Sequence, residues 1–72
     1  MNNKNKIKIT VNGKQMTVKL KFSIKSLIDK LKMPISKVAI ELNREIVSKK
    51  NINKIFLKTG DKVEIVHFIG GG

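Results

Sequence analysis

One segment of the chain has the apolar spacing of a helix, and segments with the spacing of strands lie on both sides of it. Four apolar residues recur at i, i+3, i+4 and i+7: Ile24, Leu27, Ile28 and Leu31. Ser23 is a favourable N-cap residue, because its hydroxyl accepts a hydrogen bond from a free N–H of the first turn. Pro34 ends the helix, because the residue before a proline disfavours helical geometry. A single helix of about two and a half turns therefore packs one face onto a sheet.

The strand pattern is clearest before the helix. Two series of apolar residues alternate with polar ones: Ile7, Ile9 and Val11, and then Met16, Val18 and Leu20. Asn12-Gly13 lies between the two series and readily takes the positive φ angles of a tight hairpin turn. Residues 6–21 are therefore predicted to form a β-hairpin with these apolar side chains on its buried face.

Three further strands are predicted after the helix, at residues 38–42, 45–47 and 62–69. The stretch between the last two is irregular, and four of its apolar residues are expected to anchor it to the core: Ile52, Ile55, Phe56 and Leu57. The order ββαβββ predicts an α+β roll of the β-grasp type, in which a mixed sheet of four to five strands packs on one main helix. A right-handed crossover places the last strand parallel to the first in the middle of the sheet.

Composition and charge limit the possible classes of protein. The 72 residues include no cysteine, so a disulfide framework, a thiolate metal site and a catalytic thiol are excluded. No apolar stretch is long enough for a signal peptide or a membrane span, and we expect a cytoplasmic protein without a membrane partner. The net charge of +11 is compatible with a basic nucleic-acid-binding module. Because Arg44 is the only arginine and the aromatic residues are three phenylalanines, the sequence favours a solvated lysine surface with no nucleic-acid partner.

Residues for conventional catalysis are scarce. His67 is the only histidine, lies in a predicted strand and has no cysteine or carboxylate cluster near it in the sequence. The five acidic residues are scattered and are interpreted as solvated surface: Asp29, Glu41, Glu45, Asp61 and Glu64. We therefore expect no enzymatic activity, no metal site and no bound cofactor.

The ending of the chain is the remaining candidate for chemistry. Residues 1–69 are predicted to form the domain, and Gly70, Gly71 and Gly72 a flexible tail. A tail without side chains adopts angles closed to other residues, and it can thread a narrow channel to place its carboxylate inside another protein. That carboxylate is anionic at neutral pH and needs activation, for example as an acyl adenylate, before it accepts sulfur. Taken alone, the glycines are equally compatible with a disordered end that has no function.

The second half of the chain resembles the sulfur carrier family of thiamine biosynthesis, which is ubiquitin-like. The matching stretches are Val38–Asn43, Glu45–Val47 and Leu57–Gly72, whereas Arg44 and Ser48 depart from the usual Gly and Pro. The resemblance implies that an activating enzyme uses ATP to adenylate Gly72. The product is then converted to a thiocarboxylate with sulfur from a cysteine desulfurase system, and thiazole synthase receives the sulfur. Gly70 and Gly71 are expected to thread into the partner sites.

Strand alternation also predicts a docking surface. If Val63 and Ile65 face the helix, Val66 and Phe68 lie on the opposite side of the sheet, where we expect them to dock on the partner enzymes. The alternative is that the neighbouring loop at residues 52–57 covers them. Other functions stay open at this point: the small subunit of molybdopterin synthase, a ubiquitin-like modifier conjugated to lysines, or the nucleic-acid-binding module.

Overall fold

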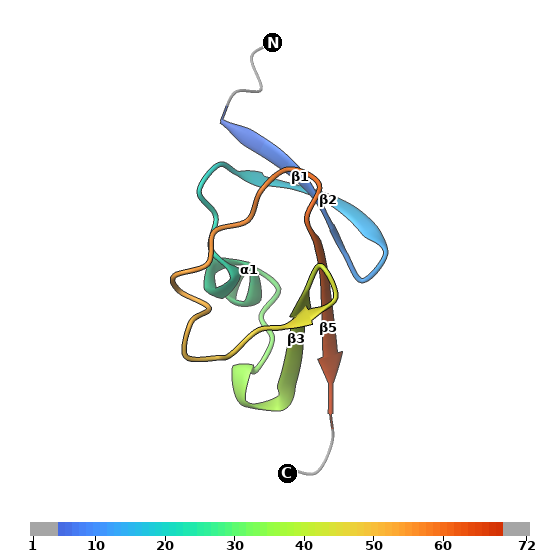
Figure 1. Cartoon of the computed structure of the whole chain (residues 1–72), viewed down its shortest axis with the longest axis vertical. Coiled ribbons are helices and arrows are strands. Elements are labelled where there is room, and N and C mark those ends of the chain that lie inside the picture. Colours follow the sequence, from blue (N-terminus) through green and yellow to red (C-terminus); the bar gives the residue numbers. More distant parts are fainter. Residues whose placement is uncertain (1–4, 69–72) are drawn as a thin grey trace.

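The computed structural model describes residues 5–68, which form five strands around one α-helix (Figure 1). The strands are β1 (Lys6–Val11), β2 (Lys14–Lys19), β3 (Val38–Leu42), β4 (Glu45–Ile46) and β5 (Lys62–His67). The helix α1 (Ile24–Lys30) lies between β2 and β3, and a short 3₁₀ helix, η1 (Ile35–Lys37), precedes β3. The predicted order of elements is confirmed.

The sheet has the strand order β2-β1-β5-β3-β4, so the last strand lies in its centre. β5 runs parallel to β1, with Val63 opposite Val11, and antiparallel to β3. The hairpin pairs on either side are antiparallel. Because α1 covers one face of this mixed sheet, the predicted β-grasp fold is confirmed (Figure 1).

The first hairpin forms as predicted up to Lys19. Asn12 and Gly13 have φ angles of 49° and 83°, and two positive values at the central positions are the signature of a type I′ turn. The prediction for Leu20 was wrong, since this side chain is 47% exposed and lies beyond the end of β2. The physical reason is that the strand ends before its alternation does. Lys21 has a φ of 64°, which turns the chain toward α1.

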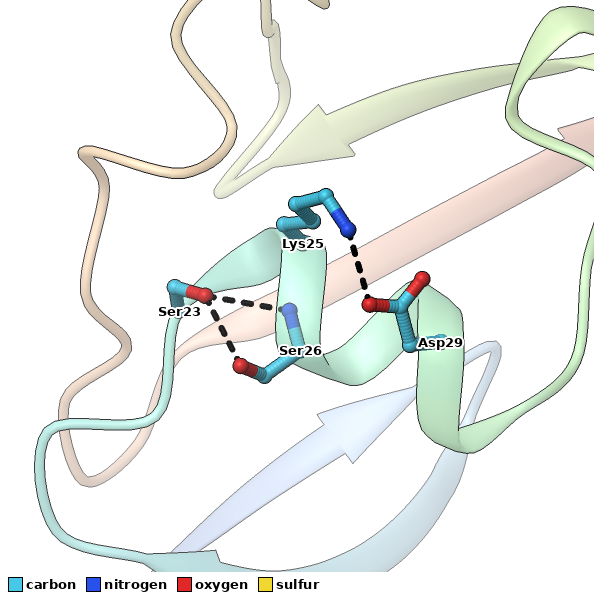
Figure 2. Close-up of polar contacts among 4 residues, drawn as sticks. All are labelled: Ser23, Lys25, Ser26 and Asp29. Atoms are coloured by element: carbon cyan, nitrogen blue, oxygen red, sulfur yellow. Dashed lines mark hydrogen bonds and ion pairs between the residues drawn. The ribbon is translucent and has the colours of Figure 1, made fainter.

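The N-terminus of α1 is capped as the sequence predicts. Ser23 Oγ accepts a hydrogen bond from the Ser26 backbone N–H at 3.0 Å and lies 3.1 Å from Ser26 Oγ (Figure 2). Ile24, Leu27 and Ile28 are the buried residues of the helix, and Leu31 follows as a half-buried C-cap. Cap and apolar stripe together therefore place α1 on the sheet.

Removing this cap should destabilise the domain. We expect Ser23→Ala to lower the free energy of unfolding by about 1 kcal/mol, because a helix N–H loses its acceptor. Urea denaturation followed by circular dichroism measures the change. The matched control is Ser36→Ala at an exposed serine, for which we expect a change within about 0.5 kcal/mol. Equal stabilities of the two variants would contradict the role of the cap.

The core lies between α1 and one face of the sheet. The buried apolar residues of the described part of the chain come from the strands, the helix and the loop before β5: Ile7, Ile9, Val11, Val18, Ile24, Leu27, Ile28, Val38, Ile40, Ile52, Leu57, Val63 and Ile65. None of the helices between residues 5 and 68 has the length and apolar character that a membrane crossing requires.

The loop before β5 anchors to the core through three of the four predicted residues. Ile52 and Leu57 are buried and Ile55 is half-buried. Phe56 is 52% exposed, so the prediction that it anchors the loop to the core was wrong. The backbone explains this result, because Ile24 N–H donates to the Ile55 carbonyl and Leu57 N–H donates to the Phe22 carbonyl. In such an extended stretch successive side chains point in opposite directions, so Phe56 points away from the core.

Candidate functional site

β5 is the element that leads toward the chain end. It lies between β1 and β3 in the middle of the sheet (Figure 1), and Phe68 directly after it donates its backbone N–H to the Lys37 carbonyl at 2.9 Å. Gly70, Gly71 and Gly72 lie outside the described residues. Their roles as the threading tail and the sulfur-carrying group therefore stay predictions.

Asn12 extends the contact between β1 and β5 beyond their last paired residues, Val11 and Val63. The Asn12 backbone N–H donates to the Val63 carbonyl at 2.9 Å. Its side-chain amide accepts from the Ile65 N–H at 2.7 Å and donates to the Ile65 carbonyl at 3.2 Å. The amide thus reproduces the donor and acceptor of one more strand residue. Consequently β5 is fixed on both edges up to Ile65, two residues before the strand ends at His67.

The start of β5 is fixed by a second small network. The Asp61 carboxylate accepts hydrogen bonds from the Lys58 backbone N–H at 2.8 Å and from the Asn43 side-chain amide at 3.0 Å. In turn, Asn43 Oδ1 accepts from the Lys62 N–H at 2.9 Å. This network ties the turn after β3 to the first residue of β5. Asp61 therefore has a structural role.

The face of the sheet opposite α1, which we call the open face, carries exposed apolar side chains. Val63 and Ile65 of β5 are buried, whereas Val66 is 56% exposed, as the alternation predicts. Val66 pairs with Ala39 of β3, which is also exposed. Ile46 of β4 is 79% exposed. We call Ile46, Ala39 and Val66 the open-face patch.

Ile46 belongs to this patch by its register. It pairs with Glu41, which in turn pairs with Glu64, and directly opposed residues of neighbouring strands share a face. The sequence prediction missed Ile46. A signal was present, however, since a two-residue turn at Asn43-Arg44 places Ile46 opposite Glu41 and thus on the face of Glu64.

Phe68 differs from Val66 in its surroundings. It is half-buried, and the Lys49 ammonium lies 5.4 Å from the centroid of its ring. The expectation that both side chains face solvent therefore holds for Val66 and only partly for Phe68. The residue that contacts the ring precedes the loop at residues 52–57, which was the predicted alternative cover. Docking through Phe68 stays a prediction.

Two of the acidic residues that the sequence left scattered face each other on the open face. Glu41 and Glu64 are directly opposed, and Arg44 and Lys62 line the same shallow depression.

His67 is exposed and pairs with Val38 across the β3–β5 ladder. Between residues 5 and 68, no group of three or more histidine or acidic side chains is close enough to hold a metal ion. The open face therefore offers a binding surface beside β5.

These features define the class of the protein: a ubiquitin-like β-grasp domain with an apolar patch beside the strand that leads to its glycine ending. The family model described as "ThiS family" matches residues 4–72, so the match includes the terminal glycines. The chain belongs to the ThiS family, and its predicted membership of the thiamine sulfur carriers is confirmed.

Individual relatives agree with this assignment. The chain is 34% identical over 65 residues to the sulfur carrier protein ThiS of Bacillus subtilis, covering 89% of this chain and 98% of that one. A crystal structure of the thiamine biosynthesis protein ThiS from Geobacter metallireducens superposes with a TM-score of 0.78 at 35% identity, covering 92% of this chain and 100% of the other. The chain is also 38% identical over 66 residues to a thiazole synthase of Paramagnetospirillum magneticum. That match covers 92% of this chain, which spans only 20% of the length of that relative.

Proposed function

We propose that the chain is a cytoplasmic sulfur carrier of thiamine biosynthesis that works through the carboxylate of Gly72 and catalyses no reaction itself. The observation that carries the proposal is the family match, which extends from residue 4 to the terminal glycine. The carboxylate attacks the α-phosphate of ATP in an activating enzyme, forming an acyl adenylate and releasing pyrophosphate. Activation is required because the free carboxylate is a poor electrophile at neutral pH.

Sulfur then replaces the adenylate. A persulfide from a cysteine desulfurase system attacks the Gly72 carbonyl carbon, and AMP leaves with the carboxyl oxygen it carries. The product is an acyl disulfide with one sulfur–sulfur bond. A thiol next attacks the sulfur that belongs to the donor's cysteine, this bond breaks, the thiocarboxylate leaves with the sulfur attached to the Gly72 carbon, and a disulfide remains on the donor side. The thiocarboxylate is an oriented nucleophile held at the acceptor site, so no free sulfide is needed. No cofactor bound to this chain takes part; ATP is consumed by the activating enzyme.

Thiazole synthase is the proposed acceptor of the sulfur. Support comes from the relative named thiazole synthase, in which the stretch similar to this chain is one fifth of a longer protein. A carrier-like segment and a thiazole synthase name thus occur together in one polypeptide. The same pairing between separate chains would bring the Gly72 thiocarboxylate to the thiazole-forming site.

The open-face patch is the proposed docking surface for the partner enzymes. Ile46 and Val66 expose apolar area next to the strand that leads to the tail, and burying such area drives association. Phe68 joins this surface if Lys49 moves from its ring, so we place it at the margin of the contact. The directly opposed Glu41 and Glu64 share a depression with Arg44 and Lys62, so this part of the open face offers charges of both signs to a partner.

Alanine scanning of the carrier tests this surface. We expect Ile46→Ala and Val66→Ala each to lower the kcat/KM of adenylation about tenfold, because central apolar contacts dominate interface energies. Phe68→Ala should have a smaller effect of the same sign. Thr17→Ala, at an exposed position of the same sheet, is the control and should leave the rate unchanged. Unchanged kinetics for Ile46→Ala and Val66→Ala would refute docking through the patch.

The chemistry itself is tested by the intact mass of the chain. After incubation with ATP, an activating enzyme and a desulfurase system with cysteine, we expect the mass increase of an oxygen-to-sulfur exchange, located at Gly72 by fragmentation. Omission of ATP is the control and should leave the mass unchanged. An unaltered chain in the complete mixture refutes the proposal. Isopeptide adducts on lysines would instead show a conjugated modifier.

A further inference from the structure

A groove lies on the α1 side of the domain, between the helix, η1 and the loop after β4. Its volume is about 540 Å³, within the range of roughly 300–1,000 Å³ that is typical of ligand sites. The lining comes from these three segments: Lys25, Ile28 and Asp29; Ile35 and Ser36; Lys49, Lys50, Ile52 and Asn53. We call it the α1 groove. It shares no residue with the open-face patch.

The floor of the α1 groove is apolar. Ile28 and Ile52 are buried residues of the core that reach its base. Ile35 of η1 is 36% exposed at its side and adds apolar surface that the domain itself does not cover. Because Ile28 and Ile52 are only 2% and 6% exposed, an apolar side chain placed here would mainly remove the surface of Ile35 from water, which is favourable in proportion to the area buried.

The rim of the α1 groove is positively charged. Lys25, Lys49 and Lys50 lie on it together with one carboxylate, that of Asp29. Figure 2 shows Lys25 and Asp29 one turn apart on α1, joined by an ion pair of 2.9 Å. Both side chains are exposed, so the pair contributes little and is easily exchanged. The rim therefore favours a ligand that carries carboxylates.

Lys49 connects the α1 groove with the end of β5. Its ammonium lies 5.4 Å from the centroid of the Phe68 ring, a weak attraction at a partly exposed site. Its side chain also lines the groove. A carboxylate in the groove competes with the ring for the same ammonium, and a full charge attracts more strongly than a ring quadrupole. Occupancy of the groove is therefore expected to change the surroundings of Phe68.

We propose that the α1 groove is a second docking site, which takes an acidic segment of a partner protein with an apolar side chain at its centre. The apolar side chain lies on Ile28, Ile35 and Ile52, and flanking carboxylates meet Lys49 and Lys50. Among residues 5–68, no aromatic residue lines the groove for base stacking, so a protein segment fits better than a nucleic acid. The site lies on the α1 side, so it can be occupied together with the open-face patch. This inference is independent of the sulfur chemistry.

The test is a titration of the ¹⁵N-labelled full chain with the blocked peptide Asp-Asp-Leu-Phe-Asp-Asp. We expect saturable amide shifts at Ile28, Ile35, Ile52 and Lys50. Two control peptides each keep one of the two recognised features. Ser-Ser-Leu-Phe-Ser-Ser keeps the apolar side chains, and Asp-Asp-Ser-Ser-Asp-Asp keeps the carboxylates. Both should bind at least about tenfold more weakly, because each lacks either the charges or the buried apolar area.

Variants separate this site from general attraction to a basic protein. Lys50→Glu should weaken binding about tenfold, whereas Lys8→Glu, an exposed charge reversal on β1, should change it less than about twofold. The proton signals of the Phe68 ring should shift on binding in the natural chain and not in Lys49→Met. The proposal is overturned by an absence of saturable shifts, by equal weakening in Lys50→Glu and Lys8→Glu, or by tighter binding of oligothymidylate at the same residues.

Discussion

Deleting Gly71 and Gly72 should abolish thiocarboxylate formation while leaving the fold intact. The shortened chain still ends in a glycine carboxylate, that of Gly70, so the reacting group is chemically unchanged. Its reach falls by about 7 Å, because an extended residue spans about 3.3–3.6 Å. An error of about 1 Å in the position of a reacting group already costs on the order of 100-fold in rate. The intact mass after the complete sulfur-transfer reaction measures the loss.

Two controls separate reach from other causes. Gly72→Ala keeps the length and the carboxylate but adds a methyl group, so its rate should fall and remain measurable if the partner channel is narrow. The amide spectrum of the deletion variant should match that of the natural chain over residues 5–68, since β5, the last described element, ends at His67, before the deleted residues. Normal sulfur loading of the deletion variant would show that the chemistry is not at Gly72.

Most of the fold is predictable from the spacing of apolar residues. The stripe from Ile24 to Leu31, the turn at Asn12-Gly13 and the cap at Ser23 each have a local physical cause, and the structure has all three. Phe56 was mispredicted because apolar character alone does not give the direction of a side chain, and Leu20 because alternation does not show where a strand ends. Leu20 lies past the last paired residue of β2, and Phe56 points outward between two residues that face inward.

The sequence analysis predicted the candidate site only where it depends on one strand. Alternation along β5 predicted the exposure of Val66, but the contribution of Ile46 depends on the register of three strands. The bridging of Ile65 by Asn12 joins residues 53 positions apart, so no local pattern indicates it. The α1 groove is assembled from three separate segments, so no local sequence pattern indicates it either.

Leu27→Ala should have the largest effect on stability. Leu27 is 0% exposed and belongs to the face that α1 packs on the sheet. Substitutions of this kind cost about 2–5 kcal/mol, through lost transfer free energy and the cavity left behind. At about 0.05–0.15 kcal/mol per residue, a domain of 72 residues has about 4–11 kcal/mol in total. The variant should therefore be close to unfolding at 37 °C.

Leu20→Ala is the matched control, because the same atoms are removed at a position that is 47% exposed. We expect a cost below about 1 kcal/mol, since surface substitutions leave no cavity. Urea denaturation of both variants, with equal slopes to verify a common unfolded state, gives the comparison. Apolar spacing alone assigns both leucines to the core, Leu20 by strand alternation and Leu27 by the helical stripe, and predicts similar losses. A loss for Leu20→Ala as large as that for Leu27→Ala would therefore contradict the end of β2 at Lys19 and restore the longer hairpin.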